Sequence, residues 1–165
     1  MTNLEQCQQF WLARRSIVLS TLSQTGESET SVTPFIRDEA GSLYIFISEL
    51  AQHTQNLLSL MADKPTDLIS GLLASDESET EQLFARERLT LQLAPTEIQR
   101  ETAEYAVLIK QFEDEFGEVV AMLNSLPDFH LIQLKPVRGG YVIGFGKAFT
   151  FEGCPCNGLT PVTRK

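Results

Sequence analysis

The sequence predicts a mainly β domain of the α+β class, with an antiparallel sheet and flanking helices. Short apolar runs of strand length follow one another between residues 16 and 48, separated by turn sequences. Polar and apolar residues alternate strictly over 88–93, whereas apolar residues recur at helical spacing within 3–14, 52–62 and 101–124. The short connections favour an antiparallel sheet, because parallel strands need long crossovers.

The chain is expected to open with a helix and three strands. The helix at 3–14 carries its apolar residues on one face, namely Leu4, Cys7, Phe10 and Trp11. Residues 16–22 and 30–38 are predicted to pair around a turn, with a third strand at 43–48 completing a meander. Pro34 lacks an N–H group, so an edge or bulge is expected there, where a flat ring could approach the backbone.

The passage from the strand at 43–48 into the helix at 52–62 is the first candidate site. Its polar side chains are Ser48, His53, Thr54 and Asn56. The first amides of a helix have no partner within the helix, and together with the helix dipole they attract anions such as phosphate. Ser, Thr and Asn at a helix start are more often caps, so a ligand site and simple capping both remain open.

Residues 67–75 predict a fourth strand, and the acidic run 75–82 is expected to be a solvated loop. In the alternating segment that follows, Leu89, Leu91 and Leu93 are predicted to face the core. Arg86 and Arg88 belong to the opposite row. That row is either ordinary solvent surface or one wall of an anion pocket, because paired arginines bind carboxylates and phosphates well.

The carboxy-terminal part is predicted to contain two helical pieces within 101–124, interrupted at Gly117, and then strands from residue 129 to 153. Gly144 and Gly146 do not form a phosphate loop, since no helix begins there, and instead indicate a bulge or a close backbone contact. Residues 1–153 are therefore expected to form one domain, followed by a flexible tail at 154–165.

Composition narrows the class of partner. The chain has 13 Lys and Arg against 22 Asp and Glu, a formal net charge of −9, which disfavours binding to nucleic acid or to an anionic membrane. No apolar run approaches the roughly 20 residues of a membrane-spanning helix, and no signal-peptide pattern is present. Three cysteines do not form a disulfide framework. A cytoplasmic protein is expected.

Four segments carry a resemblance to a known family: FISELAQHTQNL, SDESETEQLFARERLTL, FEDEFGEVVAMLNSLPDFHLIQLKP and GYVIGFGKAF. Over residues 10–153 the chain resembles the HugZ/HutZ-like haem-utilisation proteins, a branch of the pyridoxamine 5′-phosphate oxidase-like FMN-binding split barrels. The resemblance implies a six-stranded antiparallel split β-barrel with flanking helices. It also implies a homodimer that holds a small planar cofactor, FMN or haem, at the interface.

The resemblance also suggests roles for individual residues. Ser48, His53, Thr54 and Asn56 would hold the FMN phosphate, Pro34, Phe35 and Arg37 would run along the isoalloxazine, and Arg86 and Arg88 would line the pocket. With haem, His53 would bind the iron or support its ligand, and Asp128 from across the interface would fix the imidazole tautomer. The family often has a basic residue where this chain has Gln52, and haem-utilising members carry an axial histidine in a region where residues 154–165 contain none.

Three functions are consistent with these features. The first is a haem-utilisation protein that binds haem and degrades it with an external reductant to release iron. The second is an FMN-dependent oxidoreductase of the pyridoxamine 5′-phosphate oxidase-like type. The third is a dimer that binds haem or flavin without catalysis.

Overall fold

This computed structural model describes residues 1–164 of the chain. The helices of that region are α1 (Asn3–Ala13), α2 (Gln52–Asp63), α3 (Ala103–Phe116) and α4 (Val119–Asn124), with three short 3-10 helices, η1 (Glu77–Glu79), η2 (Leu83–Ala85) and η3 (Pro155–Asn157). The strands are β1 (Ser16–Leu22), β2 (Ser28–Pro34), β3 (Ile36–Arg37), β4 (Leu43–Ser48), β5 (Ile69–Ala74), β6 (Arg88–Ile98), β7 (Phe129–Gly144), β8 (Lys147–Glu152) and β9 (Thr160–Pro161).

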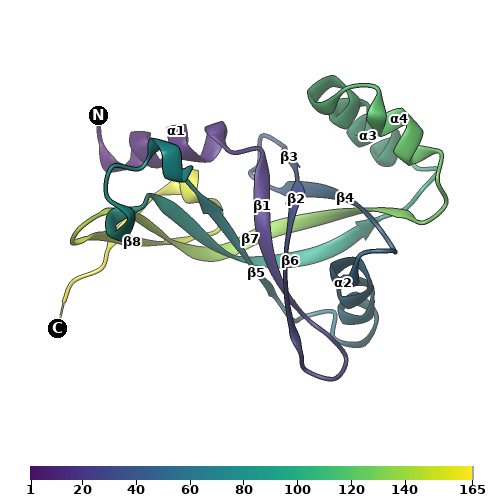
Figure 1. The fold of residues 1–165 in the computed structure, drawn as a ribbon, viewed down its shortest axis with the longest axis horizontal. Coiled ribbons are helices and arrows are strands. Elements are labelled where there is room, and N and C mark those ends of the chain that lie inside the picture. Colours follow the sequence, from purple (N-terminus) through teal and green to yellow (C-terminus); the bar gives the residue numbers. More distant parts are fainter. Residues whose placement is uncertain (165) are drawn as a thin grey trace.

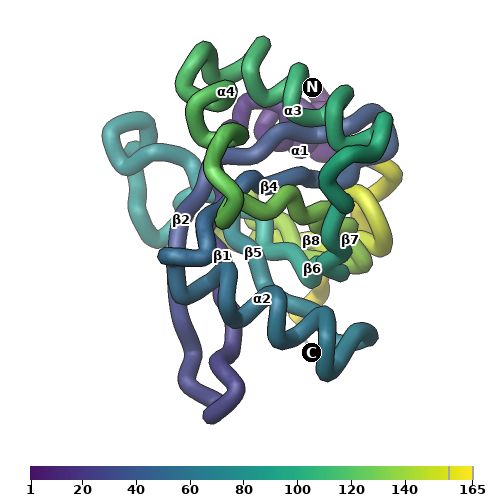
Figure 2. The backbone as a smooth tube through the Cα atoms, turned by 90° about the vertical axis from the view of Figure 1, so that its right-hand side faces the viewer, coloured from purple at the N-terminus to yellow at the C-terminus, as the bar shows by residue number. Residues whose placement is uncertain are grey.

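All strand pairs are antiparallel, and the sheet runs in the order β2-β1-β5-β6-β7-β4-β3, with β8 and β9 added beside β7. The long strands β6 and β7 cross the molecule, with α1 over one end and α2, α3 and α4 around the other (Figure 1). Turned by 90°, α3 and α4 lie above the strands and α2 lies below them (Figure 2). The predicted antiparallel sheet with flanking helices is confirmed.

Two details of the predicted sheet differ. The described residues form nine strands rather than six, because β8 and the two-residue strands β3 and β9 are added, and the hydrogen-bonded order is open at its two ends. The expected meander is confirmed only in part: the end of the predicted strand at 30–38 forms β3 and pairs with β4, but β2 does not, and the longer partner of β4 is β7. The chain leaves β2 at Pro34, which has no N–H to donate, and the Phe35 amide turns to the carbonyl of Arg15.

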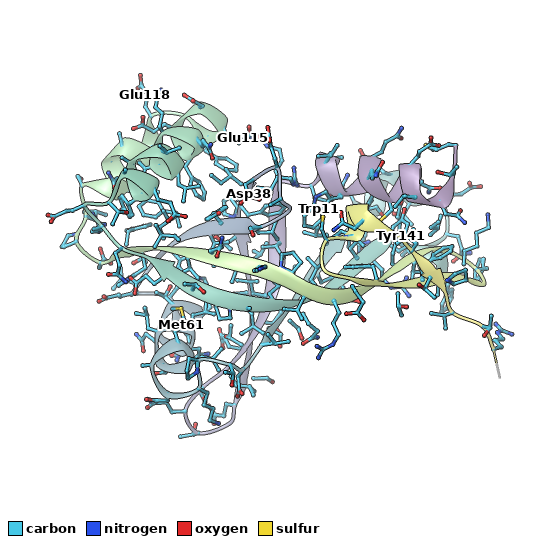
Figure 3. The ribbon with its side chains drawn as sticks, turned by 180° about the vertical axis from the view of Figure 1, so that it is seen from behind. Trp11, Asp38, Met61, Glu115, Glu118 and Tyr141 are labelled. Atoms are coloured by element: carbon cyan, nitrogen blue, oxygen red, sulfur yellow. The ribbon has the colours of Figure 1, made fainter. Side chains whose placement is uncertain are left out.

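The core has two parts. The larger lies inside the curved sheet under α1 and α2, and includes the fully buried Leu89, Leu91 and Leu93, as the alternation predicted. Trp11 and Tyr141 lie between α1 and the strands beneath it (Figure 3). The smaller part packs α3 and α4 on the other face of the sheet. The predicted break between these helices is present, since α3 ends at Gly117 with a left-handed φ of 88°.

A close backbone approach and a bulge explain the glycines of β7. A Cβ atom at Gly139 would lie 2.1 Å from the carbonyl oxygen of Thr90 and 2.4 Å from the ring of Phe151. The register of β7 with β8 shifts between Val142 and Gly144, so the predicted bulge is present. Together these features let β6 and β8 pack closely against β7.

The first part of the expected flexible tail packs on the fold, whereas residues 160–164 are exposed. Cys154 and Pro155 are buried, and β9 pairs with β8. Lys165, the last residue of the expected tail, lies outside the described residues. Within residues 1–164, none of the helices is both long enough and apolar enough to cross a bilayer.

Candidate ligand site

The end of β4 and the start of α2 form a hydrogen-bonded junction, residues 48–56. The Ser48 hydroxyl donates to Asp128 Oδ2 over 2.7 Å and accepts from the Leu50 amide at 3.1 Å. The Glu49 amide donates to the Asp128 carbonyl at 2.9 Å. Pairing of β4 with β7 places Ser48 opposite Phe129, so the structure brings together two predicted site residues that are 80 positions apart.

Two polar residues of α2 in the junction, Thr54 and Asn56, are buried, and the polar groups of Asn56 are already used. The Asn56 side chain donates to Thr21 Oγ1 at 3.1 Å, which joins α2 to β1, and it accepts from the Gln52 side-chain amide at 2.9 Å. Thr54 is fully buried, and its Oγ1 has no hydrogen-bond partner among the described residues. No side chain caps this helix, since its N-cap is Ala51.

His53 is half-buried and makes no hydrogen bond within residues 1–164. Burial lowers the pKa of its imidazole below the ordinary 6.5, and the nearby carboxylate of Glu29 opposes that shift only in part. At neutral pH the ring is therefore uncharged. A neutral imidazole offers a nitrogen lone pair to a metal but attracts an anion weakly.

These groups do not fit the phosphate of FMN. A phosphate ester carries up to two negative charges at neutral pH and needs cations or free donors around it. The Ser48 hydroxyl already donates to a carboxylate, the Asn56 amide is committed, and Gln52 adds no charge. Asp128 would also repel the ligand at this position.

The residues around the β2–β3 break have structural roles. Phe35 is buried in the core, which leaves it no free face for a flavin ring. Arg37 donates to the carbonyls of Leu12 and Arg14, which satisfies the carboxy-terminal end of α1, and its guanidinium lies 4.9 Å from the Phe35 ring centre. A cleft of about 590 Å³ adjoins them, near Asp38 and Glu115 (Figure 3).

Arg86 and Arg88 lie at the start of β6. Arg86 Nε donates to the Ser75 carbonyl at 2.7 Å, and one Arg88 nitrogen donates to the Arg86 carbonyl at 2.8 Å. Arg88 makes no other hydrogen bond within the described chain, so its remaining donors are available to a ligand. Arg88 pairs with Val142, whereas Ser48 pairs with Phe129, so the two groups occupy opposite ends of β7 (Figure 1). One protomer therefore does not bring all the predicted site residues together.

A three-residue cluster beside the junction was missed by sequence reasoning. His130 Nδ1 lies 2.5 Å from Glu97 Oε1, and His130 Nε2 lies 2.7 Å from Glu49 Oε1. Strand alternation predicts that His130 lies on the side opposite Phe129 and Leu131, as a packed or surface residue, and gives no sign of its two carboxylate partners. Local alternation could not have revealed the cluster, because it depends on the register of β6 and β4 with β7.

The outer face of β2, β1, β5 and β6 presents an uncharged row across four strands, which we call the open face. Strand register places Val32 beside Val18, Val18 beside Leu72, and Leu72 beside Thr90. Val32 is 65% exposed. A shallow hollow of about 380 Å³ on this face is lined only by residues of β1, β5 and β6, none of them charged.

A Clostridium acetobutylicum protein of the pyridoxinephosphate oxidase family, related to general stress protein 26, has a solved structure that superposes with a TM-score of 0.63. The match covers 90% of this chain and 93% of that one at 11% identity, which shows a common fold. The chain thus shares the split-barrel fold of the pyridoxamine 5′-phosphate oxidase-like proteins. No family model matches it.

A closer relationship comes from sequence. Heme oxygenase HutZ of Vibrio cholerae is 32% identical over 148 residues, which cover 90% of this chain and 80% of HutZ. The chain belongs to the HutZ family of haem-utilisation proteins. The crystal structure of HutZ, there called a haem storage protein, matches with a TM-score of 0.74 at 28% identity over 93% of this chain and 96% of that one. Campylobacter jejuni ChuZ matches with a TM-score of 0.81 at 30% identity over 96% of this chain and 61% of that one.

Proposed function

We propose that this protein binds haem between two copies of the chain and degrades it with an external reductant, which releases the iron. The identity with HutZ over most of both chains carries the proposal. HutZ is described both as a haem oxygenase and as a haem storage protein, so degradation is tested separately from binding. We place this function in the cytoplasm, in keeping with Cys7, which forms no disulfide within the described residues.

The side chains present fit haem better than FMN. A histidine that binds haem iron must be a neutral imidazole with an open nitrogen, which describes His53, whereas both ring nitrogens of His130 contact carboxylates. The remaining donors of Arg88 suit a propionate. Bound haem would supply an iron centre that activates oxygen once electrons arrive. The protein's part is to hold and orient the macrocycle and to exclude water from it.

A homodimer joined through the open face would bring the separated groups together. The row of Val32, Val18 and Leu72 is uncharged, so two copies that each carry a formal charge of −9 can meet there without like charges in contact. An uncovered sheet face with apolar side chains is also a surface that association removes from water. In such a dimer, His53 of one protomer and Arg88 of its partner border the same ligand.

Titration with haemin is expected to give a Soret band that saturates with a Kd at or below the micromolar range, which corresponds to about −8 kcal/mol. His53→Ala is expected to weaken binding at least tenfold, because a coordinate bond to iron is lost. Free imidazole should restore the band in this variant, which controls for damage to the fold. If His53→Ala binds like the wild type, His53 is not the ligand. If the wild type shows no Soret band, the haem proposal fails.

Degradation is tested on the loaded protein with ascorbate and oxygen, with catalase present to remove peroxide. Loss of the Soret band together with capture of ferrous iron by a chelator is the result expected here. A Soret band that persists through many equivalents of reductant would contradict degradation and assign storage.

A further inference from the structure

His130 joins three segments of the fold. It stands in β7 between Glu97 of β6 and Glu49, which lies in the link from β4 to α2. The imidazole is 18% exposed, whereas the side chains of Glu97 and Glu49 are 30% and 52% exposed. Each ring nitrogen lies within hydrogen-bond distance of a carboxylate oxygen.

This arrangement requires a protonated ring. A carboxylate only accepts hydrogen bonds, and a neutral imidazole has one N–H and one lone pair. Only the imidazolium can donate to both glutamates, because in the neutral ring one lone pair would face a carboxylate oxygen. The positions of Glu49 and Glu97 therefore depend on one proton.

The surrounding charges favour that proton. Burial acts to lower the pKa of His130, but the hydrogen bonds and charges of Glu97 and Glu49 outweigh it and raise the pKa above 6.5. Asp128, two residues earlier, adds a further carboxylate and is bonded to Ser48. Arg100 is a cation that lines the same cleft of about 170 Å³ and donates to the carbonyls of Asn124, Leu126 and Phe129.

The direction of the pH effect follows from that shift. Because the folded pKa lies above 6.5, the stabilisation from the two contacts is complete below pH 6.5 and is lost as the pH rises through the folded pKa. Glu49 is the partner expected to leave, since it is the more exposed carboxylate and lies in a link rather than in a strand.

We propose that protonated His130 is a positioning residue that latches Glu49, and with it the start of α2, against β6 and β7. The Glu49 carbonyl accepts from the Gln55 side chain at 3.0 Å, so release of Glu49 reaches the first turn of α2, where His53 lies. A metal is not required, because the ring separates the two carboxylates, and no group of His, Cys, Asp or Glu within residues 1–164 is arranged to hold one. Any influence of the latch on a haem ligand of His53 rests on the proposed function, whereas the latch itself does not.

The latch is tested on the ligand-free protein by NMR of ¹⁵N-labelled histidine. The chain has two histidines, so His53→Ala assigns both signals. We expect His130 to titrate above pH 6.5 and to do so at a lower pH in Glu49→Gln. Asp114→Asn is the matched control, because it removes an exposed carboxylate paired with Lys110 on α3 and should leave the midpoint unchanged.

Hydrogen exchange supplies the second readout. Protection of the amides in 49–56 is expected to fall at least about threefold in the wild type when the pH is raised through the His130 midpoint, after correction for intrinsic exchange. In Glu49→Gln the protection should be low both below and above the His130 midpoint, because the neutral amide makes no ion pair with protonated His130. A His130 midpoint at or below 6.5, or wild-type protection that is unchanged across the midpoint, would overturn the proposal. Neither result depends on haem, so failure of the haem titration leaves this test intact.

Discussion

Replacing Gly139 with alanine is expected to destabilise the fold by about 3 kcal/mol or more, because the added methyl group has no space. Its carbon would overlap the Thr90 carbonyl oxygen at 2.1 Å and the Phe151 ring at 2.4 Å. β6 and β8 pair with β7 on either side, so relief requires movement of paired backbone. For a chain of this size the melting temperature should fall by roughly 6–12 °C, which calorimetry measures directly.

Gly144→Ala is the matched control on the same strand. No heavy atom outside its own neighbours lies within 4 Å of a Cβ placed there, and its φ is not in the left-handed region. We expect a change within about 0.5 kcal/mol. If Gly139→Ala and Gly144→Ala have the same melting temperature, β6 and β8 do not pack as closely against β7 as described.

Replacing Val32 with glutamate is expected to convert the proposed dimer to a monomer. In a two-fold interface the same residue enters from both copies, so the substitution brings two new carboxylates into an apolar contact of an acidic protein. Light scattering should then give the 18.4 kDa of one chain in place of twice that mass. Haem affinity should fall at least tenfold, because the proposed site needs groups from both protomers.

Val107→Glu provides the comparison. Val107 is 57% exposed on α3, close to the 65% of Val32, but it lies away from the open face. This variant should keep the dimer mass and the haem affinity of the wild type. A wild-type chain that runs at 18.4 kDa would contradict the dimer, and a dimeric Val32→Glu would place the interface elsewhere.

Much of the fold was predictable because local patterns determine it. Alternation located the buried leucines of β6, and the break at Gly117 separated α3 from α4. The partner of β4 was not predictable in the same way. The sequence of a hydrophobic strand does not specify which distant strand it pairs with, and here the partner β7 begins some 80 residues after β4 ends.

The candidate site was predictable only in part. Ser48 and Asp128, which the sequence assigned to the site for different reasons, do meet, whereas the expected pairing of Asp128 with His53 stays a prediction. Sequence could not show that Asn56 is already satisfied by Thr21 and Gln52, since hydrogen-bond partners are set by tertiary packing. The contact of His130 with two glutamates required the register of three strands at once.

The length of β7 has a genetic consequence. Residue 130 of this strand lies near the junction of β4 and α2, and residue 142 lies beside Arg88. At about 3.3 Å per residue, the two positions are roughly 40 Å apart along the strand. In the proposed dimer, each ligand would therefore draw its histidine and its arginine from different chains. Co-expression of a His53→Ala chain with an Arg88→Ala chain would therefore give mixed dimers in which one pocket is doubly impaired and the other is wholly wild type.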